Sequence, residues 1–426
     1  MPREQIKQTP TISRVAGDTL VELVYEPSNR QTALVVSRFG GLWNKEDEVQ
    51  IGSETLVPYA ATNNLIANDC VQLPSIPEEF YTKSELIADI MTFLHRYVDL
   101  SAEFEVLAAY YILLTWVYDR FLEVPYIRVR GEWGSGKTRA LMTIGSLCNK
   151  AFFASGASTT SPLFHVQNHF RGTLVLDEAD FSHSDMRADI VKVLTSGSVA
   201  GMPILRTMTN KSRELNPEAF HCFGPKLIGM REAFDDLALE SRFLTEETGT
   251  RPLRPDIPLQ LPPGWKEEAL HLRNRLLHFR LCEYFKVAAS PSAAVPGIEP
   301  RINQGAIGLL SLVDDPGHRQ IIVKTLVERD AAIQLERKDT PEAAVLAALR
   351  RVLSLGDSPT ASVRAICDSY NEQRDPGQFD PASYKWVGYI LRKRLRVPTR
   401  RVGGVYVVSR TDAARLDGMA ARLGIS

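Results

Sequence analysis

A glycine-rich stretch, GEWGSGKT at residues 131–138, carries residue types whose spacing suits phosphate binding. It matches the pattern G-x-x-x-x-G-K-[ST] at every fixed position. Small residues let consecutive backbone N–H groups close around a phosphate, and the N-terminus of a following helix adds partial positive charge. The Lys137 ammonium would reach the β and γ phosphates, and the Thr138 hydroxyl would take a magnesium position. The residues expected to contact a nucleotide are Gly131, Glu132, Trp133, Gly134, Ser135, Gly136, Lys137, Thr138 and Arg139.

The flanking segments decide between a phosphate loop and a chance run of glycines before Lys-Thr. The β-branched run VPYIRVRG precedes the stretch and predicts a buried strand. The run KTRALMTIGSLCN follows it and predicts a helix. A pattern of this kind also occurs by chance, so the strand–turn–helix context is what favours the phosphate loop.

A second motif, TLVLDEAD at residues 173–180, reads as a strand that ends in two acids. Asp177 is expected to order magnesium, directly or through water, and Glu178 to polarise the attacking water as general base. A strand ending in solvated acids is common by itself. Two motifs in this order and separation predict a site that hydrolyses ATP with Mg²⁺ as cofactor.

Composition limits the classes of protein and partner. A chain of 426 residues is too long for one ordinary core, and 44% hydrophobic with 24% charged residues is typical of a soluble globular protein. The net charge is −1, so a nucleic acid would have to be met by local basic patches. The five scattered cysteines include no C-x-x-C pair, which fits a reduced, cytoplasmic compartment. The apolar run at residues 104–122 contains Glu105, Asp119 and Arg120, so we expect a buried helix and no membrane partner.

The pattern of elements predicts an α/β fold with four regions. Residues 1–80 read as short strands between Asn, Gly and Pro turns. From 81 to 250, helices come first, and strands then alternate with helices, which predicts a parallel sheet covered on both faces. Residues 251–340 are helical after a proline-rich crossover, and residues 341–426 look like a separate small domain.

Several motifs resemble the AAA+ ATPases. The Asp177–Glu178 pair, the strand KLIGM and the segment DDLALESRFL look like an AAA+ module. Longer stretches over about residues 105–315, among them ASTTSPLFHVQNHFRGTLVLDEAD and LTSGSVAGMPILR, are similar to helicase-like AAA+ ATPases of phages, plasmids and integrated elements. The resemblance implies a three-layer αβα core at 81–250 and a helical lid at 251–340. It also implies a ring, a hexamer, that hydrolyses ATP between subunits and drives DNA replication.

The same resemblance assigns roles to three arginines. Arg242, in the SRF triplet, would be an arginine finger that enters a neighbouring subunit's site; alternatively it is a surface arginine or pairs with Glu240 or Asp236. Arg231 occupies the sensor 1 position, where Asn, Thr or Ser is usual. Arg301, in EPRINQGAIGLL, resembles sensor 2 of the related minichromosome-maintenance helicases, or it is a helix-start arginine that faces solvent.

Two further segments could contact nucleic acid. Residues 201–223 lie about where such helicases insert a pore-lining hairpin, and Arg206, Lys211 and Arg213 could grip phosphates there, or form a solvated basic loop. The C-terminal order of helix, loop, helix and hairpin resembles a winged helix, with Val387, Ile390, Leu391 and Leu395 facing its core. Its expected DNA contacts, or protein contacts in the alternative, are Lys385, Arg392, Lys393, Arg394, Arg400 and Arg401.

The function that these features predict is an ATP-driven DNA helicase or translocase acting on single-stranded or forked DNA. Two alternatives use the same residues. One is a loader, remodeller or defence ATPase that does not separate strands. The other is a winged-helix DNA-binding regulator whose oligomeric state ATP switches.

Overall fold

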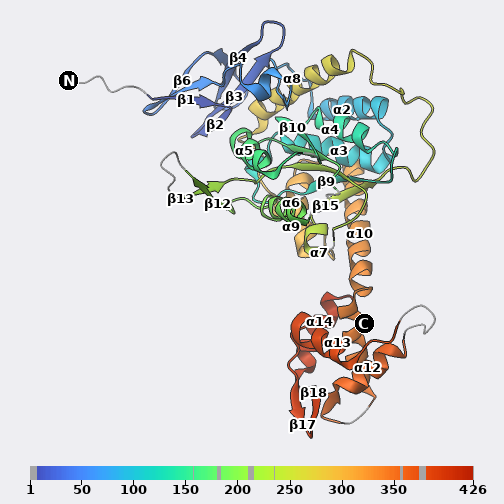
Figure 1. Ribbon diagram of the computed structural model, residues 1–426. Coiled ribbons are helices and arrows are strands. Elements are labelled where there is room, and N and C mark those ends of the chain that lie inside the picture. Colours follow the sequence, from blue (N-terminus) through green and yellow to red (C-terminus); the bar gives the residue numbers. More distant parts are fainter. Residues whose placement is uncertain are drawn as a thin grey trace. The chain divides into compact units, whose positions relative to one another are not determined.

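The computed structural model describes residues 7–156, 158–179, 184–209, 215–234, 236–355, 358–373 and 380–425. The chain divides into two compact units, residues 1–327 and residues 328–426, and many elements of both are labelled in Figure 1. The first unit contains the N-terminal strands and the α/β core, and the second contains the C-terminal helices and a small sheet.

The N-terminal strands form two small sheets, as the strand-rich sequence predicts. An antiparallel sheet has the order β2-β3-β4-β5, and a second has the order β1-β7-β6. The predicted strand at residues 19–26 is β3. The bounds are β1 Lys7–Thr11, β2 Ser13–Ala16, β3 Thr19–Glu26, β4 Gln31–Arg38, β5 Trp43–Glu46, β6 Val49–Ile51 and β7 Glu54–Pro58.

A six-stranded sheet organises the core in the order β15-β9-β14-β11-β10-β8. Its first five strands run parallel, and β8 joins the edge antiparallel. These five parallel strands are the ones the sequence predicts between residues 126 and 247. The bounds are β8 Val71–Gln72, β9 Tyr126–Arg130, β10 Ala151–Ser155, β11 Leu174–Asp177, β14 Lys226–Met230 and β15 Phe243–Glu247.

Helices cover both faces of this sheet because its strands are apolar on both sides. The helix α4 lies on the face of Phe153, Val175 and Gly229. On the other face, the Tyr126 hydroxyl donates to Leu194 O in α6. The helices of the first unit are α1 Asn64–Ala67, α2 Lys83–Tyr97, α3 Ala102–Thr115, α4 Lys137–Gly145, α5 Thr160–Phe170, α6 Ser184–Ser196, α7 Leu237–Glu240, α8 Trp265–Glu283 and α9 Pro300–Leu310, and α10 Pro316–Lys338 continues into the second.

The apolar run that the sequence assigns to a buried helix is α3. Its residues from Phe104 to Thr115 are all buried, including Glu105. The helix ends at Thr115, and a short 3-10 turn at Tyr118–Arg120 follows. Within the described part of the chain, no helix combines the length and apolarity that a membrane crossing requires.

A buried network of charges joins the N-terminal strands to the core. Glu22 in β3 accepts from Lys150 Nζ at 2.8 Å and from Arg280 Nε at 2.7 Å, and Arg280 also forms a two-bond pair with Asp119. Glu22, Lys150 and Arg280 are at most 4% exposed. Burial by itself would raise the pKa of Glu22, but the charges of Arg280 and Lys150 outweigh it and hold the pKa below its ordinary value.

Glu22→Ala is expected to lower the free energy of unfolding by about 3–5 kcal/mol, because it leaves two buried cations with one fewer carboxylate. The native pKa of Glu22 is lowered, so its stabilisation is present at neutral pH and is lost as the pH falls through that pKa. Chemical denaturation at pH 7 measures the effect. As a control, Arg38→Ala removes one side of the more exposed Arg38–Glu46 pair and should cost less than about 1 kcal/mol. Equal losses for the two variants would contradict the prediction.

The second unit follows the predicted order of helix, loop, helix and hairpin. Its sheet has the order β16-β18-β17, and the hairpin turns at Gly403-Gly404. The four apolar residues predicted for its core, Val387, Ile390, Leu391 and Leu395, are buried. The bounds are α11 Pro341–Ser354, β16 Thr360–Ser362, α12 Val363–Asn371, α13 Tyr384–Tyr389, a π-helical turn Ile390–Arg394, β17 Arg400–Val402, β18 Val405–Ser409 and α14 Ala413–Arg422.

Candidate nucleotide site and nucleic-acid interface

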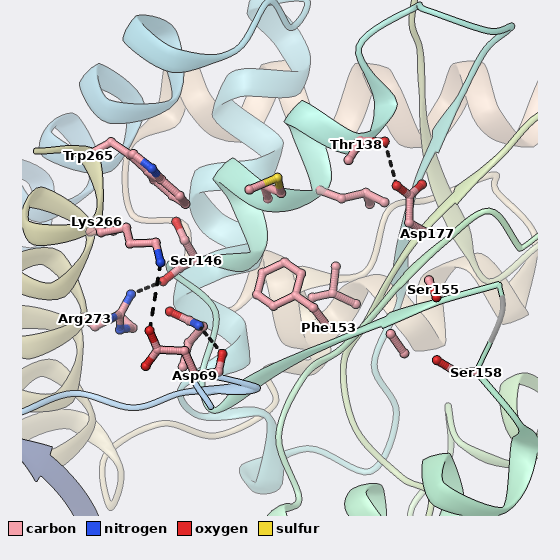
Figure 2. Close-up of a pocket in the computed structure, with 16 residues that line it drawn as sticks. Asp69, Thr138, Ser146, Phe153, Ser155, Ser158, Asp177, Trp265, Lys266 and Arg273 are labelled. Atoms are coloured by element: carbon pink, nitrogen blue, oxygen red, sulfur yellow. Dashed lines mark hydrogen bonds and ion pairs between the residues drawn. The ribbon is translucent and has the colours of Figure 1, made fainter. Parts of the chain in front are cut away.

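The glycine loop and the acidic pair meet at the carboxyl ends of the parallel strands, which form one edge of the sheet. The strands β9 and β11 both pair in parallel with β14, so their carboxyl ends lie at the same edge. The loop follows β9, and Asp177 ends β11. The Thr138 hydroxyl donates to Asp177 Oδ2 at 2.6 Å, the contact that Figure 2 shows as a dashed line. Residues 39 positions apart thus form one site.

Glycines give the loop its shape. Gly134 and Gly136 have φ of 72° and 91°, a left-handed conformation that glycine adopts without steric cost, and Gly136 caps α4. Gly131 packs closely: a Cβ there would lie 2.5 Å from Thr248 O. The Ser135 and Thr248 hydroxyls lie 3.0 Å apart, so the loop is held against the end of β15. The start of α4 therefore lies next to Asp177, which its second residue, Thr138, contacts.

The Lys137 side chain crosses its own loop. Its Nζ donates to Gly131 O at 2.6 Å and to Glu132 O at 2.8 Å. Both are neutral carbonyl acceptors, and charge-assisted bonds to phosphate oxygens are stronger. A phosphate held in the loop would therefore draw the ammonium away from them.

Both carboxylate oxygens of Asp177 have partners. Oδ2 accepts from Thr138, and Oδ1 accepts from the backbone N–H of Glu178 at 2.9 Å. Glu178 itself is exposed and has φ of 55°, an uncommon value for a residue other than glycine. Residues held in such conformations cluster at functional sites. The turn leaves Glu178 at the solvent side of the edge, next to Asp177.

The donor set fits Mg²⁺. A hydroxyl and one carboxylate are hard oxygen ligands, and Mg²⁺ in nucleotide sites is held by one or two carboxylates, the substrate phosphates and water. Among the described residues, no cluster of three or more His, Cys, Asp or Glu side chains could hold a metal ion. The fit therefore depends on a nucleotide that brings its own phosphate ligands.

A glycine that sequence reasoning missed makes room for Asp177. A Cβ at Gly229, the fourth of the five residues of β14, would lie 2.8 Å from Asp177 Oδ1 and 2.7 Å from Leu141 Cδ1. Any larger residue would push the carboxylate or α4 aside. A glycine inside a strand pattern is the signal that could have revealed this close approach.

Arg231 lies beside the glycine loop. It follows β14 at the same edge, and its guanidinium carbon is 5.1 Å from the ring centroid of Trp133, a residue that is 78% exposed. Cation and ring at this distance attract each other. The position predicted for a nucleotide-sensing residue is thus next to the loop.

Arg139 points to a different part of the chain. Its guanidinium donates to three backbone carbonyls, Tyr97 O at 3.3 Å, Pro258 O at 3.0 Å and Leu259 O at 2.7 Å. It therefore ties α4 to the proline-rich crossover after the sheet. Its contact with nucleotide stays a prediction.

A cavity of about 550 Å³ opens beside the Thr138–Asp177 pair (Figure 2). Leu141, Met142, Phe153 and Val175 give it an apolar wall along α4 and the sheet. Trp265, Lys266 and Arg273 of α8 and Asp69 line its other side. The sequence gives no motif for this space, because the residues that line it come from separate segments.

Arg242 and Arg301 lie near the amino ends of the parallel strands, at the opposite end of the strands from the glycine loop. The backbone N–H of Tyr126, the first residue of β9, donates to Arg242 O at 2.8 Å. Arg242 Nη1 and Arg301 Nη1 both donate to Ala238 O, at 3.1 and 3.4 Å. Arg242 Nε also donates to Ser198 Oγ at 2.8 Å. Burial lowers the pKa of the half-buried Arg242, and the nearby charge of Arg301 also lowers it.

Glu240 is not the partner of Arg242. It forms a two-bond ion pair with Arg128 of β9, at 2.5 and 2.7 Å, and also accepts from Phe234 N. Arg128 and Glu240 are at most 1% exposed. The pair fixes α7, the short helix that precedes Arg242, against β9.

A hairpin is present where the sequence predicts one, formed by β12 Ile204–Thr209 and β13 Leu215–Phe220. Arg206 on β12 lies against the body of the protein: its guanidinium carbon is 4.4 Å from the Phe164 ring centroid, and Nη2 is 4.0 Å from Asp189. Lys211 and Arg213 lie outside the described residues.

The cations predicted on the second unit are all on its surface. Lys385, Arg392, Lys393, Arg394, Arg400 and Arg401 are exposed, and Arg394 lies 3.8 Å from Glu342. Three tyrosines that sequence reasoning missed are also exposed: Tyr384 (58%), Tyr389 (48%) and Tyr406 (51%). For Tyr389 the signal was its position two residues from each of the core residues Val387 and Leu391, which places it on the opposite side of the helix.

The comparisons with known proteins give likenesses to solved structures alone. No protein-family model matches the chain, and no curated protein matches it. An apo structure of the NrS-1 C terminal region is 10% identical, with a TM-score of 0.38, over 91% of this chain and 96% of that one. The structure described as "SCCmec type IV Cch - active helicase" is 9% identical, with a TM-score of 0.37, over 96% and 95%. With TM-scores below 0.5, these likenesses carry no weight for function, which rests on the site itself.

Proposed function

We propose that the protein is an ATP-hydrolysing AAA+ DNA motor, a helicase or translocase of a mobile or viral element. The observation that carries the proposal is the Thr138–Asp177 contact of 2.6 Å. It joins a phosphate loop at a helix N-terminus to an acid at the end of another parallel strand. That arrangement suits a nucleoside triphosphate with its metal better than a solvated turn, which would not need two converging motifs.

Each residue of the site has a task in hydrolysis. Lys137 and the backbone N–H groups of the loop offset charge on the phosphates. Thr138 and Asp177 would hold Mg²⁺, which when bound neutralises charge on the β and γ phosphates. Glu178 follows Asp177 and is exposed at the same edge, so it can take a proton from an attacking water.

The arginines at the opposite edge support a site shared between subunits. The strand β9 separates them from the loop, and its five residues span roughly 16 Å. An arginine side chain does not reach that far, so Arg242 and Arg301 would act on the nucleotide of a neighbouring copy. A head-to-tail contact of this kind closes into a ring, and we propose a hexamer.

The exposed cations of the second unit support a role on DNA. The whole chain has a net charge of −1, yet residues 384–406 contain seven Lys and Arg residues and no Asp or Glu. Local concentrations of positive charge bind the phosphate backbone without regard to sequence. The unit would serve as the DNA-binding domain of the motor, in the manner of a winged helix.

The function is tested by ATP turnover and strand separation with the full chain. ATP hydrolysis should rise when forked DNA is added, and the fork should unwind. Lys137→Ala is expected to abolish nucleotide binding, turnover and unwinding together, because it removes the charge that offsets the phosphates. Nucleotide affinity within a few-fold of the unchanged protein would contradict the site.

The same experiment separates the alternatives. Turnover stimulated by DNA without unwinding would favour a loader, remodeller or defence ATPase. ATP-dependent assembly without turnover would favour a DNA-binding regulator. The exposed Glu178 beside Asp177 favours the enzyme over the regulator, since a switch that only binds ATP needs no general base.

A further inference from the structure

The hairpin of the second unit has an apolar tip in a cationic surface. We call residues 402–405 the wing tip: Val402 and Val405 form the last cross-strand pair, and Gly403-Gly404 joins them. The two valines are 51% and 46% exposed. Both glycines have positive φ, 55° and 84°, so the turn is tight and both valines are carried to its end.

Aromatic and cationic side chains surround the tip. Tyr406 pairs across the strands with Arg401 and is 51% exposed, and the guanidinium carbon of Arg392 lies 5.5 Å from its ring centroid. Arg392 belongs to the π-helical turn, so this contact links the helix to the hairpin. Phosphate binding explains the cations. It does not explain why apolar and aromatic groups stand at the end of the hairpin.

From this arrangement, and resting on the proposed role in DNA binding, we propose that the wing tip and Tyr406 contact unpaired bases at a junction of single-stranded and duplex DNA. Apolar side chains on nucleic-acid-binding proteins insert between bases, and aromatic rings stack on unpaired bases. The positive charge around the tip favours an anionic partner, because residues 384–406 contain seven Lys and Arg residues and no Asp or Glu. Insertion into uninterrupted duplex must first unstack a base step, whereas a junction already exposes the faces of its unpaired bases, so the junction is the more favourable partner for the tip.

The test measures the affinity of the full chain for three DNAs, from the fluorescence anisotropy of a label on the DNA. The three are a blunt duplex, a fork with the same duplex, and a single strand. Val402→Thr combined with Val405→Thr keeps the size and β-branching of both residues but makes the tip polar. Tyr406→Ala removes the ring, and Tyr406→Phe is its matched control. The first two variants are expected to lower the preference for fork over blunt duplex by about 10-fold, and Tyr406→Phe to keep it.

A double change, Lys393→Ala with Arg394→Ala, distinguishes the junction from the DNA surface as a whole and leaves Arg392 in place beside Tyr406. This change should weaken binding to all three DNAs by a similar factor, and it should reduce the dependence of affinity on salt concentration. If this change alters none of the three affinities, the proposal that this surface binds DNA is overturned, and the result favours an acidic protein as its partner. If it weakens binding while the tip variants keep the full fork preference, only the junction contact is overturned. Should Tyr406→Ala unfold the unit, the threonine pair still decides.

Discussion

Arg242→Ala is expected to bind ATP almost normally and to lose about 10³-fold or more of its turnover. The residue lies at the edge of the sheet away from its own loop, so it contributes nothing to binding there. In a shared site, its guanidinium would stabilise charge on the γ-phosphate of the adjacent copy during transfer. Nucleotide titration and steady-state hydrolysis of the same preparation measure the two quantities.

Mixing variants tests whether the site is shared. Lys137→Ala lacks a working loop but keeps Arg242, and Arg242→Ala keeps the loop. A mixture should recover part of the activity, because some interfaces then join an intact loop to an intact arginine. Sizing with labelled subunits must show that the two variants form mixed assemblies. If mixed assemblies form and are no more active than their parts, Arg242 is a structural or cis-acting residue.

Glu178→Gln is expected to retain ATP binding and to lose turnover by about 10²- to 10⁴-fold. Glutamine has the same size, so Asp177 and its contact with Thr138 should remain, but the amide cannot accept a proton from water. Hydrolysis and nucleotide affinity are measured side by side. Asp177→Asn is the matched control, because it should alter the dependence of binding on Mg²⁺, which Glu178→Gln should leave unchanged. Normal turnover in Glu178→Gln would place the general base elsewhere.

The sequence predicted the elements that depend on nearby residues. The strand before the loop, the helix after it and the strand ending at Asp177 follow from local apolar patterns and glycine spacing. Their convergence could also be predicted, because parallel strands end at a common edge. The Thr138–Asp177 contact is the result.

Features set by distant packing could not be predicted in the same way. Arg139 reads as part of the loop, but its partners are carbonyls more than a hundred residues downstream, at Pro258 and Leu259, together with Tyr97. Arg206 reads as a loop cation, yet Phe164 and Asp189 hold it against the body. In each case a long side chain found partners whose position only the folded chain defines.

The network around Glu22 has a consequence for how this chain can be divided or recombined. The N-terminal strands look like an appendage, but Glu22 supplies a carboxylate to two interior cations, Lys150 in the core and Arg280 in α8. A chain shortened to begin after residue 80 would leave those cations with one fewer carboxylate. The strands and the α/β core therefore depend on each other for stability, and grafting this core onto another N-terminal region would require replacing Lys150 and Arg280 as well.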